Sequence, residues 1–192
     1  HLIFPVLKVG GEKRAVSDHY ISEWRSCVLE NPYLSLNDWI DTFNKENKTG
    51  KKGVIYKDEA IAVHTKLSYK NFESLYRVVL IWMPERMNLE ASNMLLKLLE
   101  EPPKGTVFLL VADNPNQLLP TISSRLQKIK ISDFTTNDIV NYFSSNKMGL
   151  EKAKQLRNLT DADLGQIIKL ESNPSMRVDF FDDFSMWNRL VY

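Results

Sequence analysis

The feature that most constrains the fold is a strand–helix–strand pattern between residues 77 and 112. The apolar run VVLI is followed by the amphipathic segment NLEASNMLLKLLE, which stops at Pro102-Pro103 because proline cannot continue a helical hydrogen-bond ladder. A second apolar run, TVFLLVA, comes directly afterwards. Short continuous apolar runs are typical of strands buried in a parallel sheet. The pattern therefore predicts an α/β fold, with a helix at 88–99 packed behind a strand at 77–83.

Weaker signals extend this pattern in both directions along the chain. Residues 2–9 (LIFPVLKV) read as a strand that Pro5 restricts to an edge or a bulge. Helical spacing begins at Ser17, and Ser35 is a suitable N-cap for a helix that starts with the next residue. The alternating segment LQKIKI at 126–131 predicts a third, less buried strand.

The character of the sequence changes after Asp133. The segments TTNDIVNYFSS, LEKAKQLRNL and ADLGQIIKLES predict three short helices, and SMRVDFFDDFSMWNRLVY predicts a fourth. We therefore expect a first domain at 1–132, a small helical domain at 133–173, and a linker or the start of a further helical domain at 174–192.

Composition excludes several classes of protein. The formal net charge is +1, from 25 basic and 24 acidic residues, so strong overall attraction to nucleic acid or membranes is not expected. Cys27 is the only cysteine, which rules out an internal disulfide or a multi-cysteine zinc site within this chain. The sequence has no long apolar span or signal peptide and predicts a soluble, cytoplasmic protein. Because it opens at His1 without a methionine, we expect it to be the middle of a longer protein.

Three motifs in the segment 76–131 carry a family resemblance. They are N-x-LLK-x-LEEPP from Asn93 to Pro103, the strand and turn FLLVADNPNQLLPTI, and the pair Ser124-Arg125. In this order they resemble the clamp-loader branch of the AAA+ ATPases, and within it the delta-prime subunits of bacterial DNA polymerase III. The resemblance implies an AAA+-type parallel sheet flanked by helices, a helical lid at 133–173, and a collar domain approached at 174–192.

The same resemblance implies that the ATPase site of this chain is degenerate. The phosphate-binding motif G-x-x-x-x-G-K-[ST] does not occur in this sequence. Family members that hydrolyse ATP follow the strand equivalent to VVLI with Asp-Glu, the Walker B pair, which holds Mg²⁺ and polarises water. Here those positions are Trp82 and Met83, neither of which offers the oxygen ligands that Mg²⁺ requires. Glu85 lies two positions too late to substitute without a shift in register.

Two further nucleotide-sensing positions also depart from the family pattern. Ala112 and Asp113 stand where related ATPase subunits carry threonines, and Gly165 stands where a lid-helix arginine would meet the γ-phosphate. We therefore expect no hydrolysis, no cofactor and no metal in this chain.

Arg125 is the candidate functional residue. In the resembling family, the arginine of a Ser-Arg-Cys motif reaches ATP bound by the neighbouring subunit; here Ser124 is kept and Leu126 replaces the cysteine. A guanidinium suits this role because it is always charged and presents a planar fork of donors. The alternative is an arginine held in a surface or intrachain salt bridge. The partners implied are ATPase subunits of the gamma/tau type and the delta subunit, and indirectly the sliding clamp and primed DNA.

Two other functions stay open from the sequence. One is an active AAA+ ATPase whose catalytic residues lie outside this segment or have shifted in register. The other is a nucleic-acid-binding domain that uses the basic loop at 44–53, including Lys48, Lys51 and Lys52. The apolar residues of the last segment are either interface or ordinary core residues: Val178, Phe181, Phe184 and Leu190.

Overall fold

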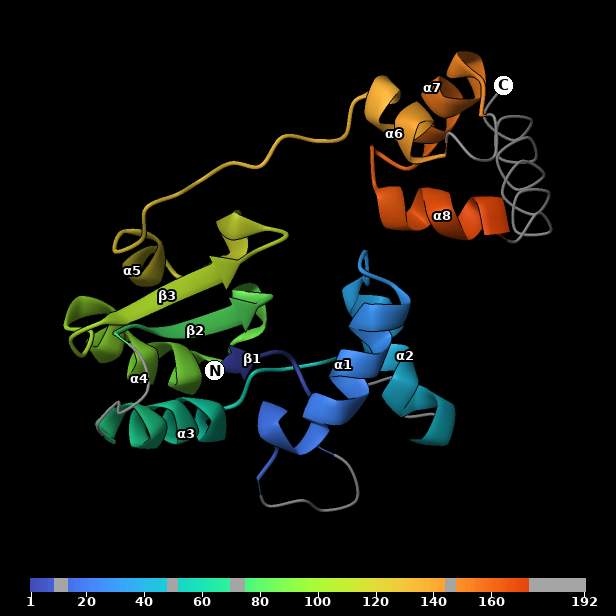
Figure 1. Cartoon of the computed structure of the whole chain (residues 1–192). Helices are drawn as coiled ribbons and strands as arrows, with labels where there is room; N and C mark the ends of the chain where they lie inside the picture. The colour runs from blue at the N-terminus through green and yellow to red at the C-terminus, as the bar shows by residue number, and fades with distance from the viewer. Residues whose placement is uncertain (9–13, 48–51, 70–74, 144–147, 173–192) are drawn as a thin grey trace, which may run out of the picture. The chain divides into compact units, whose positions relative to one another are not determined.

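The chain folds into two compact units, of which the first is His1–Lys128 and the second begins at Ile129. The computed structural model describes residues 1–8, 14–47, 52–69, 75–143 and 148–172. The predicted α/β class, a parallel sheet with flanking helices followed by a helical segment, is confirmed (Figure 1). The elements of the first unit are β1 (Leu2–Ile3), η1 (Ser17–Tyr20), α1 (Ile21–Glu30), α2 (Leu36–Asn47), α3 (Lys57–Ser68), β2 (Arg77–Trp82), η2 (Pro84–Arg86), α4 (Leu89–Glu100), β3 (Thr106–Val111), η3 (Pro115–Gln117) and α5 (Pro120–Ser123).

The described sheet has three parallel strands in the order β1-β2-β3, with β2 in the centre. The expected edge position of the first strand is confirmed, but that strand covers only Leu2–Ile3 instead of 2–9. Past Pro5 the chain leaves the ladder, and Val6 makes a single antiparallel bridge to Val54. A proline nitrogen cannot donate to a ladder, which accounts for the early end.

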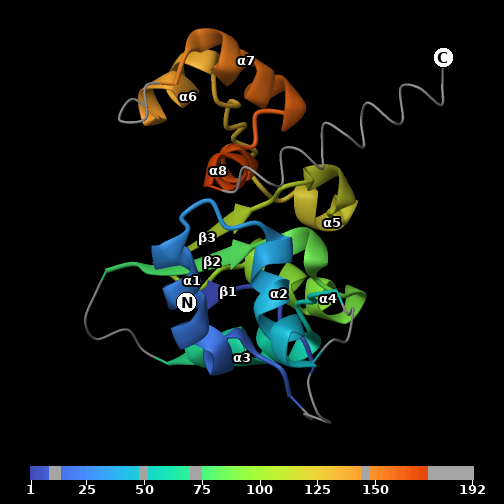
Figure 2. The same cartoon turned by 90° about the vertical axis from the view of Figure 1, so that its right-hand side faces the viewer.

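One face of the sheet is covered by α3 and α4 (Figure 2). Val79 and Ile81 of β2 are fully buried against this helical layer. Helix α4 begins after Asn88, whose side chain accepts a hydrogen bond from the Ala91 amide at 2.8 Å. The helix residues of this core are Ala60, Val63, Leu67, Leu95 and Leu98. Met94 of the same helix, in contrast, is 38% exposed.

The opposite face of the sheet carries an aromatic cluster at the end of β2. Phe4 stacks on Trp24 with ring centroids 4.5 Å apart, and Trp39 meets both rings edge-on at 5.2 Å. The Trp39 indole is fully buried and donates to the Pro5 carbonyl at 2.7 Å. Toward β3, the apolar side chains on this face are exposed: Val78, Val107, Leu109 and Val111.

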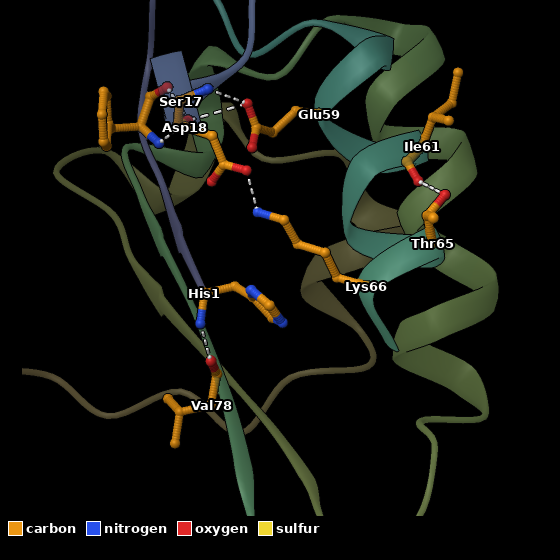
Figure 3. A network of polar contacts seen from close by, with 9 residues as sticks. His1, Ser17, Asp18, Glu59, Ile61, Thr65, Lys66 and Val78 are labelled. Carbon is orange, nitrogen blue, oxygen red and sulfur yellow. Dashed lines mark hydrogen bonds and ion pairs between the residues drawn. The ribbon is translucent and has the colours of Figure 1, made fainter. Parts of the chain in front are cut away.

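A buried polar network joins the first strand to α3 (Figure 3). The Glu59 carboxylate accepts from the Ser17 amide at 2.7 Å and from the Ser17 hydroxyl at 3.0 Å. The Ser17 hydroxyl in turn accepts from the Phe4 amide at 3.0 Å. Beside it, Asp18 forms an ion pair with Lys66 of α3. Burial raises the pKa of Glu59, and the hydrogen bonds from Ser17 act against this increase.

The strand predicted at 126–131 is wrong. These residues follow the α5 turn in an extended course without a described strand partner, and Ile129 and Ile131 are 76% and 81% exposed. The boundary between the two units falls inside the segment, after Lys128. Alternating polarity describes side chains, but a strand also needs a neighbour that accepts its backbone hydrogen bonds.

The second unit contains α6 (Thr136–Tyr142), α7 (Leu150–Leu159) and α8 (Leu164–Ser172), which confirms the three predicted helices. Helix α6 opens with a capping box, in which Thr135 and Asp138 each bond the backbone amide of the other. The predicted fourth helix and its four apolar residues lie outside the described residues. The domain limits at 132 and 173 stay a prediction.

Candidate functional site

The candidate site lies where β2 and β3 end, since this is where the sequence predicts a degenerate ATPase centre. Strand β2 ends at Trp82, and Met83 then turns the chain with the left-handed angles φ 55° and ψ 56°. The Met83 amide donates to the Val111 carbonyl at 2.9 Å. The carboxyl ends of the two strands are therefore held together by a backbone hydrogen bond at the positions predicted to be a degenerate Walker B pair.

The Trp82 side chain belongs to the aromatic cluster. Its ring lies 4.6 Å from the Trp24 ring, centroid to centroid, with the planes tilted by 55°. It is half-buried against the core residues around Phe4 and Trp39. Aromatic pairs of this kind stabilise by about 0.5–1.5 kcal/mol beyond the area that they bury. Trp82 is thus a packing residue at the end of a strand, as expected from its chemistry.

Glu85 links the ends of the two strands. Its Oε1 accepts from the backbone amides of Asp113 and Asn114, each at 3.0 Å. Its Oε2 is buried without a hydrogen-bond partner among the described residues. The sequence pattern does not select Glu85, because it lies two positions beyond the expected carboxylate. The structure shows it bound to the turn after β3, a contact across 28 residues that no local pattern signals.

The remaining predicted positions are divided between the two units. Ala112 and Asp113 follow β3 directly, and Asp113 is exposed. They lie near Met83, because Met83 bonds the neighbouring Val111. Gly165 is buried within α8 of the second unit. Within the described ranges, no three His, Cys, Asp or Glu side chains gather as a potential metal site.

Arg125 lies on a hydrogen-bonded turn that directly follows α5. Ile122 is fully buried, and the Arg125 amide donates to its carbonyl at 3.0 Å. The Arg125 side chain donates from Nη1 to the Thr121 carbonyl at 2.6 Å, and its Nη2 forms an ion pair with Glu100. The side chain is still 35% exposed. The intrachain salt bridge considered from the sequence is therefore present, and the role in trans stays a prediction.

The neighbouring Ser124 has a local structural role. Its hydroxyl donates to the Thr121 carbonyl at 3.2 Å, and its amide donates to Pro120 at 2.9 Å. These bonds close the turn that presents Arg125.

Of the basic loop considered for nucleic-acid binding, Lys52 is exposed, while Lys48 and Lys51 lie outside the described residues. Helix α2 continues to Asn47, so it occupies the first part of the loop predicted at 44–53. No helix in the described part of the chain is long and apolar enough to cross a membrane.

Comparison with known proteins gives a consistent set of relatives. The chain is 29% identical over 119 residues to the DNA polymerase III delta-prime subunit of Bacillus subtilis, covering 62% of this chain and 36% of that protein. It is 55% identical over 49 residues to the delta-prime subunit of Pseudomonas aeruginosa, covering 26% of this chain and 15% of that protein. A DNA polymerase III tau subunit from Bacillus subtilis is 32% identical over 83 residues, which is 43% of this chain and 15% of that protein.

A family model also matches a large part of the chain. The chain spans about a third of the length of the Bacillus delta-prime subunit. The model described as DNA polymerase III, delta subunit, matches residues 34–135, more than half of the 192-residue chain. The matched segment contains β2, α4, β3 and the Arg125 turn. The chain therefore belongs to the DNA polymerase III delta subunit family.

Proposed function

We propose that this chain is part of a delta-prime-type clamp-loader subunit that does not hydrolyse ATP itself and provides Arg125 to ATP bound by a neighbouring subunit. Its partners are then ATPase subunits of the gamma/tau type and the delta subunit, which together load the sliding clamp on primed DNA. Family membership and the delta-prime relatives support the assignment to a clamp loader.

The observation that carries the proposal is the contrast between the end of β2 and the turn after α5. Trp82 packs into an aromatic cluster where a hydrolase needs a carboxylate for Mg²⁺. Arg125, by contrast, is a partly exposed cation on a hydrogen-bonded turn. This combination supports a subunit that contributes a charge to another active site while lacking one of its own.

The chemistry of arginine explains why one residue is sufficient. In the transition state of phosphoryl transfer, negative charge spreads over the oxygens of the γ-phosphate. A guanidinium donates to two such oxygens at once and stays charged at any physiological pH. Arginine fingers raise hydrolysis by roughly 10³–10⁵-fold in other nucleotide hydrolases. Loss of Arg125 is therefore expected to slow hydrolysis at the neighbouring site by about 10³-fold or more.

An active ATPase is the competing function. It requires an oxygen ligand for Mg²⁺ near the end of β2, and Glu85 is the acidic residue nearest in sequence. One oxygen of Glu85 is occupied by two backbone amides and the other is buried, so this carboxylate supports the turn after β3. Hydrolysis by the full-length protein alone, abolished by Glu85→Gln, would establish the competing function.

The proposal is tested in the complete clamp loader, assembled from the full-length protein with its cognate ATPase and delta subunits. ATP turnover stimulated by clamp and primed DNA is measured for wild type, Arg125→Ala and Lys128→Ala. Lys128 is an exposed cation three residues away that is in no ion pair with a described residue, so its variant removes the same charge nearby. We expect Arg125→Ala to lower turnover in a complex that still assembles, and Lys128→Ala to leave it unchanged. Equal turnover in all three complexes would overturn the role in trans.

A further inference from the structure

The starting observation is the ion pair between Glu100 and Arg125. Glu100 is the last residue of α4, and Arg125 follows α5. Glu100 Oε1 meets Arg125 Nη2, while Arg125 Nη1 donates to the Thr121 carbonyl at 2.6 Å. The guanidinium is therefore held at both terminal nitrogens by groups from two different elements.

Glu100 and Thr121, the two residues that hold the guanidinium, belong to helices that are packed into the first unit. Helix α4 is fixed by Leu95 and Leu98, which are 1% and 8% exposed, and α5 by Ile122, which is fully buried. The two helices contact each other directly. The amide of Glu101 closes the end of α4 by donating to the Lys97 carbonyl at 3.1 Å. Glu100 and Thr121 thus offer fixed positions to a side chain that is otherwise long and flexible.

The remaining donors of Arg125 are directed to neither anchor. Neither contact uses Nε–H or the second hydrogen of either terminal nitrogen. With 35% of the side chain exposed, an anion can approach the guanidinium without first breaking both contacts. A guanidinium whose plane is fixed before the anion arrives stabilises developing charge better than one that must be ordered during the reaction.

We infer that Glu100 is a positioning residue for Arg125: it orients the guanidinium toward the γ-phosphate of ATP bound by the neighbouring subunit. This inference rests on the proposed function in trans. Because Glu100 acts only through Arg125, its effect disappears when Arg125 is absent. The opposite role, in which Glu100 withholds Arg125 from the neighbour, would make turnover rise when Glu100 is removed.

The size of the effect follows from what remains after Glu100 is lost. The Thr121 carbonyl still holds one terminal nitrogen, so Glu100→Ala is expected to cost less than Arg125→Ala. We expect kcat to fall about tenfold, as for a catalytic group that keeps its charge but loses its orientation. The KM for ATP is expected to change less than about twofold, because the neighbouring subunit provides the contacts that bind ATP equally in the ground state and in the transition state. Glu100→Gln keeps an acceptor oxygen but loses the charge and is expected to fall between wild type and Glu100→Ala.

The experiment is a double-mutant cycle in the complete clamp loader, with kcat and KM for ATP measured in the presence of clamp and primed DNA. The variants are Glu100→Ala, Glu100→Gln, Arg125→Ala, the double variant of Glu100→Ala with Arg125→Ala, and Glu101→Ala. Glu101 is the matched control, because it is the adjacent acidic residue and its exposed side chain is in no ion pair with a described residue. Assembly of each complex is checked by size-exclusion chromatography, and the Gln variant decides the outcome if the Ala variant does not assemble.

The expected result has three parts. The kcat of Glu100→Ala falls about tenfold, Glu101→Ala matches wild type, and the double variant is no slower than Arg125→Ala alone because the two residues act as one unit. If Arg125→Ala is slow but Glu100→Ala matches wild type or is faster, the positioning role is overturned while the role of Arg125 stands. Additive losses in the double variant would also overturn it. If Arg125→Ala itself matches wild type, it is the proposed function that fails.

Discussion

Replacement of Glu59 tests the polar network that fixes the first strand to α3. This side chain is only 3% exposed and accepts both the amide and the hydroxyl of Ser17. In Glu59→Ala the Ser17 amide keeps its burial but loses its acceptor, which costs about 1–3 kcal/mol. With the cavity left by the missing side chain, the expected loss in the free energy of unfolding is about 3 kcal/mol. Glu59→Gln keeps an acceptor for Ser17, so its expected change at neutral pH is below about 1 kcal/mol.

The two variants also differ from wild type in pH dependence. Burial raises the pKa of Glu59 above 4.5, with a smaller contribution in the same direction from Asp18, while Ser17 and Lys66 oppose it. The folded state therefore binds a proton more tightly than the unfolded state. The contribution of this proton to the free energy of unfolding is fully present below pH 4.5 and is lost as the pH rises through the folded pKa of Glu59. Between pH 4.5 and the folded pKa, the free energy of unfolding falls with a slope that approaches about 1.4 kcal/mol per pH unit.

The assay is urea unfolding of the full-length protein between pH 4 and pH 8. It is followed by tryptophan fluorescence and, at Ser17, by amide hydrogen exchange. Trp24 and Trp39 are buried in the first unit and report on it. The Gln variant is expected to gain stability relative to wild type as the pH rises, while Glu23→Gln, an exposed control in α1, follows wild type. Parallel pH profiles for wild type and Glu59→Gln would refute the assignment of this pH dependence to Glu59.

Three other predictions concern the strand ends and the second unit. Trp82→Ala is expected to lower the free energy of unfolding by about 2 kcal/mol through lost aromatic packing without creating ATP hydrolysis by the full-length protein; unchanged urea unfolding would contradict it. Glu85→Ala is expected to speed amide exchange at Asp113 and Asn114 by about tenfold, because each amide loses its acceptor; equal exchange rates would show that the contact does not order the turn. Hydrogen bonds from Thr135 lower the pKa of Asp138, so the cap of α6 is present above pH 3.8 and is lost as the pH falls through the lower folded pKa. An NMR titration in which Asp138 has an ordinary pKa would contradict this.

The local sequence pattern is sufficient where a helix satisfies its own hydrogen bonds or where an apolar run pairs with a neighbouring strand. Strands β2 and β3, helix α4 and its stop at the proline pair follow directly from apolar runs and periodicity. The segment 126–131 fails for the opposite reason. Its alternation is correct for a strand, but in the described part of the chain no neighbour pairs with it. Strand formation depends on a partner that the segment itself does not encode.

The candidate site could be predicted only in part. Sequence identified Trp82, Met83 and Arg125 as unusual or functional, since residue type and motif are local information. The contacts of these residues were not predictable in the same way. Glu85 reaches Asp113 across 28 residues, and Glu100 pairs with Arg125 across a turn and a strand. Such pairings depend on which strand ends and helix ends the fold brings together.

We propose that this chain hydrolyses no ATP itself and completes one ATPase site of a neighbouring subunit. The most direct measurement is the burst of ATP hydrolysed in a single turnover by the assembled clamp loader, with and without Arg125→Ala. We expect the substitution to remove about one ATP per complex from the fast phase, because each chain provides one arginine to one site. The wild-type protein alone is expected to show no burst. An unchanged burst amplitude and rate with Arg125→Ala, or a burst from the protein alone, would contradict it.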